Sequence, residues 1–146
     1  MKLVANISDQ TVSVGDEFRA RLVENLSRAH IAQYAGASGD FNSVHVDEIF
    51  ATLEAARPSV IAHGMLTMGL TATFVTSIVG HCALRSFGGR FLAPVRPGDT
   101  LECLATVCEV VTEDDGTRRV SLRLETRSAT GVLLFAGEAE ACVTSR

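Results

Sequence analysis

The chain has 146 residues, a length that fits one folded domain with a single hydrophobic core. Nearly half of its residues are hydrophobic, which argues against an intrinsically disordered chain. Its formal net charge of −4 argues against a nucleic-acid-binding surface, which normally carries a basic stripe. We therefore expect one domain over residues 1–146 and no nucleic-acid partner.

Neither a targeting segment nor a membrane span is evident in the sequence. The N-terminal stretch MKLVANISDQTVSVGDEF lacks the long apolar region of a secretory signal and soon becomes acidic. The longest uncharged apolar run, Gly64 to Leu84, is rich in threonine and contains His81. The four cysteines lack CxxC spacing, so neither disulfides nor a metal site are expected. These features predict a cytoplasmic protein without a membrane partner.

The first elements are a strand and two short helices. A turn at SVGDEF leads into a strand expected at about residues 17–24. Ser27 is placed to cap a helix whose apolar residues recur at helical spacing. We expect Gly36 and Gly39 to end this helix, and the polar stretch GASGDFNSVHVD to follow as a loop. A second short helix is predicted over residues 46–56.

A long helix is predicted over residues 64–80. This segment has no charged residue, and its apolar residues fall on most faces of the implied helix. That pattern is typical of a buried helix. At about 1.5 Å per residue the helix would span roughly 25 Å, enough to cross a small sheet.

The remainder of the chain has the pattern of antiparallel strands. Strands are expected at residues 83–93, 100–112 and 133–143, with PVRPGD and EDDGT as turns. Between the last two, polar and apolar residues alternate from Arg119 to Arg127, the period of a half-buried strand. Together these elements predict an α+β fold in which a curved antiparallel sheet wraps around one long central helix.

Three stretches carry a resemblance to a known family: YAGASGDFNSVHVDEIFA, IAHGMLTMGL and FLAPVRPGDTL. Together they resemble the MaoC-like family of (R)-specific enoyl-CoA hydratases and (3R)-hydroxyacyl-ACP dehydratases. YAGASGDFNSVHVDEIFA resembles the hydratase motif, whose core G-D-x-N-P-x-H corresponds to Gly39, Asp40, Asn42 and His45. IAHGMLTMGL resembles the start of the family's central helix, and FLAPVRPGDTL resembles its strand–turn–strand. The resemblance covers almost the whole chain in the expected order and implies the hotdog fold, in agreement with the periodicity.

The resemblance also implies an active site. Asp40 and His45 would form the water-binding catalytic pair, and Gly64 would be the backbone donor to the substrate oxyanion. Hydration of a 2-enoyl thioester needs a water deprotonated near C3 and a proton delivered to C2, tasks that a carboxylate and an imidazole can share. We favour His45 as the principal base and Asp40 as the group that orients the water, although the sequence leaves this division open.

The oxyanion site can be argued from the position of Gly64. Negative charge builds on the thioester oxygen during hydration, and a backbone N–H at a helix N-terminus stabilises such charge. Glycine allows the thioester to approach the backbone closely. No metal or redox cofactor is implied, because the thioester itself serves as the electron sink.

Three further residues are expected around the substrate. Asn42 would hold the loop or the catalytic pair in place through its amide. Tyr34 would either line the acyl pocket or pack on its own helix. His63 belongs to the same motif as Gly64, and for it a structural hydrogen bond is favoured over catalysis.

One position departs from the family motif, and two other functions stay open. Ser43 replaces the usual proline, which would fix φ and stiffen the loop. A hotdog acyl thioesterase is one alternative, although such enzymes usually carry a carboxylate on the central helix and residues 64–80 have none. The other is a non-catalytic acyl-binding subunit of a heteromeric dehydratase, against which Asp40 and His45 argue.

The expected partners are an acyl-CoA or acyl-ACP thioester and a second hotdog chain. A single sheet leaves an edge strand and apolar surface that pairing would cover, so we expect a homodimer or a heterodimer. Single arginines could meet the phosphates of CoA or of a carrier-protein arm, although for each a solvated strand-edge position is favoured: Arg85, Arg90 and Arg96.

Overall fold

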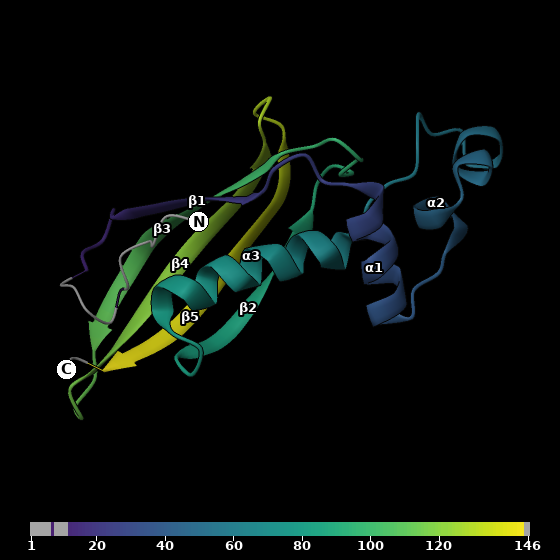
Figure 1. The fold of residues 1–146 in the computed structure, drawn as a ribbon. Helices are drawn as coiled ribbons and strands as arrows, with labels where there is room; N and C mark the ends of the chain where they lie inside the picture. Colours follow the sequence, from purple (N-terminus) through teal and green to yellow (C-terminus); the bar gives the residue numbers. More distant parts are fainter. Residues whose placement is uncertain (1–6, 8–11, 145–146) are drawn as a thin grey trace.

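The computed structural model describes residue 7 and residues 12–144, and its main element is one five-stranded antiparallel sheet (Figure 1). The strands lie in the order β1-β3-β4-β5-β2, so β1 and β2 form the two edges. Each predicted strand is present within a few residues of its expected bounds. The bounds are Glu17–Val23 for β1, Leu84–Phe91 for β2, Leu101–Thr112 for β3, Thr117–Ser128 for β4 and Leu133–Thr144 for β5.

The long helix α3, Gly64–Val79, crosses one face of this sheet (Figure 1). Its sheet-facing side is fully buried and packs against the inward side chains of the strands, among them Leu122 and Leu124 of β4. Thr71, buried on this side, shares a hydrogen bond of 2.8 Å with Thr126 of β4, so the hydroxyls of these two buried threonines are paired. The predicted sheet around a central helix is therefore confirmed.

The opposite side of α3 differs from the expectation of a helix buried all round. Met65, Gly69, Thr73 and Ser77 recur every four residues and form an exposed stripe along the helix. The sheet covers only one side of α3, and no described residue of this chain lies over the stripe. No helix in the described part of the chain is long and apolar enough to cross a membrane.

Three helical segments extend beyond one end of the sheet (Figure 1). Helix α1, Arg28–Ser38, begins at Ser27, whose side chain accepts the His30 N–H, as predicted. It ends at Gly39, which has φ of +75°, a left-handed conformation that favours glycine. The prediction that Gly36 also ends the helix is wrong, because Gly36 lies within the continuous turns of α1.

The following segment is more helical at its start and less regular at its end than predicted. The stretch expected as a loop contains the single turn α2, Ser43–Val46. The helix expected over residues 46–56 is interrupted at Asp47, which adopts an extended conformation and whose carboxylate accepts the Phe50 N–H. A π-helical turn, η2, then spans Phe50–Glu54.

A pair of glycines in β2 and β5 leaves room for a large aromatic ring above the two strands. Gly89 of β2 lies opposite Gly137 of β5, and the ring of Phe135 occupies the space above both. Phe135 is fully buried and contacts the ring of Phe91 at 5.6 Å between centroids. Phe91 in turn lies against Gly64, since a Cβ built there would be 3.2 Å from the Phe91 ring. This chain of contacts connects the sheet to the N-terminus of α3.

Candidate active site

The segment between α1 and α2 is shaped by two short polar bonds. One oxygen of the Asp40 carboxylate, Oδ1, accepts the N–H of Asn42 at 3.2 Å. The side chain of Asn42 accepts the Val44 N–H at 3.1 Å and so caps α2. Because α2 is a single turn, His45 is placed back toward Asp40. Asn42 thus acts on the geometry of the loop, and its role in the reaction stays a prediction.

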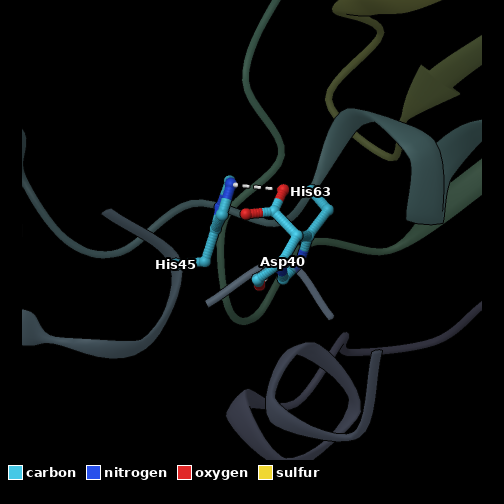
Figure 2. Close-up of side chains that lie close together, drawn as sticks. All are labelled: Asp40, His45 and His63. Carbon is cyan, nitrogen blue, oxygen red and sulfur yellow. Dashed lines mark hydrogen bonds and ion pairs between the residues drawn. The ribbon is translucent and has the colours of Figure 1, made fainter. Parts of the chain in front are cut away.

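Asp40 and His45 face each other across a short gap (Figure 2). His45 Nδ1 lies 2.8 Å from the carbonyl of Ile61, which can only accept, so Nδ1 carries the proton and Nε2 a lone pair. Nε2 lies 3.9 Å from Asp40 Oδ2, too far for a direct hydrogen bond. Two acceptors at this separation match the two protons of one water molecule.

His63 lies behind this pair and is almost completely buried, with 2% of its surface exposed. Its Nε2 lies 2.9 Å from the backbone carbonyl of Asp40 and therefore donates to it. Its ring stacks on the His45 ring with 3.8 Å between centroids and 27° between planes. On its other side, the Tyr34 ring lies 5.0 Å away in a tilted arrangement.

Gly64 and His45 line one pocket of about 410 Å³. Gly64 is the first residue of α3, where the N–H groups have no acceptor within the helix and the helix dipole is positive. The pocket wall is largely apolar, including Phe91, Leu92 and Val95. A bound acyl thioester could thus reach a base and a backbone donor from the same cavity.

An ion pair between Arg28 and Glu48 connects the helical segments at the site. Arg28 at the start of α1 pairs with Glu48, and Glu48 also accepts the N–H of Val60, shortly before α3. The hydrogen bond from the Arg28 guanidinium holds the pKa of the Glu48 carboxyl below its ordinary value. These contacts connect Arg28, which precedes His45 in the chain, to Glu48 and Val60, which follow it.

The side chains of Asp40, His45 and His63 lie close enough together for a metal site, but they do not have the geometry of one. Asp40, His45 and His63 can each offer one ligand atom within 4.8 Å of the others. The lone pairs of two stacked imidazole rings, however, lie in nearly parallel planes, whereas zinc ligands must converge on one point. His63 Nε2 is also engaged by the Asp40 carbonyl. The arrangement fits a shared water better than a shared cation.

Tyr34 does not line the pocket of His45 and Gly64, and its part in acyl binding stays a prediction. Its ring packs against His63, and it also lines a second pocket of about 400 Å³ between α1, the end of β1 and α3. The wall of this pocket is mostly apolar and includes Leu66 and Leu70. Ile61, Phe91 and Arg57 also line the pocket of His45, although the sequence analysis assigned none of them a role. Ile61 and Phe91 lie in two of the stretches that resemble the family, whereas Arg57 lies outside them.

Ser43, the departure from the family motif, occupies a position that suits proline. It is the first residue of α2, where proline is favoured because the missing N–H has no helical acceptor. Asn42 before it has φ of −53° and ψ of 129°, the extended conformation that a residue before proline adopts. The loop therefore keeps a proline-compatible path without the proline.

Ser43→Pro is accordingly expected to stabilise the protein by about 0.4–1 kcal/mol, because it restricts the unfolded chain without straining the folded one. Urea unfolding should show a higher midpoint with an unchanged m-value. A lower midpoint would mean that the backbone at Ser43 differs from the geometry described.

Comparison with known proteins identifies the family of the chain. The family model described as "MaoC like domain" matches residues 9–130. The (R)-specific enoyl-CoA hydratase of Rhodospirillum rubrum is 35% identical over 129 residues, which cover 87% of this chain and 86% of that protein.

Two solved structures have the same architecture. The R-hydratase PhaJ1 of Pseudomonas aeruginosa superimposes with a TM-score of 0.82 at 25% identity, covering 97% of this chain and 88% of the other. The (R)-hydratase of A. caviae gives a TM-score of 0.79 at 26% identity, covering 92% and 98%. The predicted hotdog fold is confirmed, and the chain belongs to the MaoC-like family of hydratases and dehydratases.

Proposed function

We propose that the protein is an (R)-specific hydro-lyase that adds water to trans-2-enoyl thioesters or dehydrates (3R)-hydroxyacyl thioesters. The observation that carries this proposal is the pair of acceptors, Asp40 Oδ2 and His45 Nε2, separated by 3.9 Å beside the pocket that contains Gly64. The name of the R. rubrum relative, an (R)-specific enoyl-CoA hydratase, supports the same reaction and stereochemistry.

In the proposed reaction, one water donates to both members of the pair. His45 Nε2 removes a proton while the water oxygen attacks C3, and Asp40 keeps the water oriented. The electron pair of the double bond moves to the thioester oxygen, where the Gly64 N–H stabilises the enolate. The enolate then takes a proton at C2 from the pair, with Asp40 as the relay, so the atoms of one water are added and no cofactor is consumed.

A thioesterase is less consistent with the site. The α3 sequence, GMLTMGLTATFVTSIV, contains no carboxylate that could activate a water for attack on the thioester carbonyl. The only acidic group of the cluster described above, Asp40, is paired with a histidine instead. Release of free CoA in the assay described below would favour the thioesterase.

We further propose that the protein works as a homodimer, or as a heterodimer with another hotdog chain. The exposed stripe on α3 and the free edge of β2 lie next to the pocket wall formed by Phe91 and Leu92, which are about half exposed. A second chain over these surfaces would bury apolar area and narrow the pocket mouth. An acyl-CoA or acyl-ACP substrate in fatty acid metabolism fits this arrangement, and the cytoplasmic location stays a prediction.

The assay for this proposal is the hydration of crotonyl-CoA, followed as loss of its enoyl absorbance. Turnover without release of free CoA is expected for a hydro-lyase. An absence of turnover would instead favour a non-catalytic acyl-binding subunit.

A further inference from the structure

His63 contacts both Asp40 and His45, although it does not line the pocket that contains His45 and Gly64. The pocket shared by His45 and Gly64 has twelve lining residues, and His63 is not one of them. With 2% of its surface exposed, His63 offers almost no area to a substrate. Any influence of this residue on the reaction must therefore pass through its neighbours.

The first of these neighbours is the backbone of Asp40. The 2.9 Å bond from His63 Nε2–H to the Asp40 carbonyl connects the residue before α3 to the segment after α1. The Asp40 side chain is about half exposed, and packing alone does little to hold it. Because the backbone bond fixes the point from which the carboxylate extends, it limits where Oδ2 can lie.

The second neighbour is the ring of His45. Tyr34, His63 and His45 form a column of three rings contributed by α1, the start of α3 and α2 (the ring column). His45 is held at one edge by the carbonyl of Ile61 and on one face by His63. These two contacts together set the direction of the Nε2 lone pair.

One buried atom of His63 lowers the stability of the folded state, and packing does not explain why it is there. Its Nδ1 is buried and has no hydrogen-bond partner among the described residues. A buried polar atom without a partner destabilises the folded state, and such atoms in native proteins call for a specific explanation. A ring without that nitrogen could fill the same space, so the imidazole is useful here for the bond that its Nε2 makes.

We propose that His63 is the positioning residue that holds Asp40 Oδ2 and His45 Nε2 on the same water. This inference rests on the proposed hydratase function and adds a residue to its machinery. His63 acts through the Asp40 backbone and through the face of the His45 ring, and it does not touch the substrate.

Two variants separate the two contacts. His63→Gln keeps a side-chain N–H donor but removes the stacked ring, whereas His63→Phe keeps the ring but removes the donor. Each is expected to lower kcat for crotonyl-CoA hydration about 10- to 100-fold, because small displacements of catalytic groups have effects of this size. KM should change by less than about threefold, since no substrate contact is lost. His81→Gln and His81→Phe, at an exposed histidine, are the matched controls and should retain wild-type kinetics.

The possible outcomes separate this inference from the proposed function. Circular dichroism and thermal unfolding establish first that each variant is folded. If wild type hydrates crotonyl-CoA but both folded His63 variants keep its kcat, the positioning role is wrong and the hydratase function stands. A raised KM with unchanged kcat would indicate a substrate contact instead, and unfolding of both variants would indicate a purely structural role. An inactive wild type would overturn the proposed function and this inference together.

Discussion

Asp40→Asn and His45→Ala are each expected to lower kcat/KM for crotonyl-CoA hydration by about 10²- to 10⁴-fold, the range of general acid–base catalysis. Asp40→Asn replaces one acceptor of the water by an amide that can also donate. His45→Ala removes the lone pair at Nε2, which lies 3.9 Å from Asp40 Oδ2. The measurement is the initial rate of enoyl absorbance loss over a range of substrate concentrations.

The controls for this prediction are the same substitutions at exposed positions. Asp114→Asn lies at the tip of the β3–β4 hairpin, and His81→Ala follows the end of α3. Both should retain wild-type kinetics. Thermal unfolding of all four variants shows whether a loss of rate comes from a loss of fold. Full activity in both site variants would remove Asp40 and His45 from the mechanism.

Gly137→Ala is expected to destabilise the protein by about 3 kcal/mol or more, at the upper end of the usual range for overpacking. A Cβ at Gly137 would lie 2.5 Å from the Gly88 carbonyl oxygen and 2.7 Å from the ring of Phe135. Neither neighbour can move easily, because one is strand backbone and the other is a fully buried ring. The change in urea midpoint at constant m-value measures this loss.

Gly88→Ala provides the matched control from the adjacent strand. A Cβ at Gly88 meets no atom within 4 Å, so this substitution should leave the unfolding free energy nearly unchanged. Gly89→Ala should behave like Gly137→Ala, because its Cβ would lie 2.5 Å from the Ala136 carbonyl oxygen. Equal urea midpoints for the variants at Gly88 and Gly137 would contradict the described position of the Phe135 ring above Gly89 and Gly137.

Much of the fold could be predicted from the sequence because its signals are local. The alternation from Arg119 to Arg127 identifies β4, and the uncharged run that begins at Gly64 identifies α3. Ser27 marks the start of α1 through its capping side chain, and Gly39 marks its end through its positive φ. Each of these features depends only on residues close together in the chain.

The features that local patterns could not predict depend on contacts between distant segments. The exposed stripe on α3 arises because the sheet covers one side of the helix, which the helix sequence alone does not reveal. The single turn at Ser43–Val46 is an exception, because the Asn42 cap that starts it is a local contact that the prediction of a loop missed. In the site, the motif brought Asp40, His45 and Gly64 together, but the bond from His45 to Ile61 and the ring column join segments that are far apart in sequence.

The most direct test of the central claim is the stereochemistry of crotonyl-CoA hydration by the wild-type protein. Loss of the enoyl absorbance reports turnover, and coupling to dehydrogenases specific for (R)- or (S)-3-hydroxybutyryl-CoA identifies the product. We predict that the (R) product forms, that free CoA is not released, and that Asp40→Asn and His45→Ala each lower kcat/KM by about 10²- to 10⁴-fold. Formation of the (S) product, release of free CoA or an unchanged enoyl absorbance would contradict the proposed function.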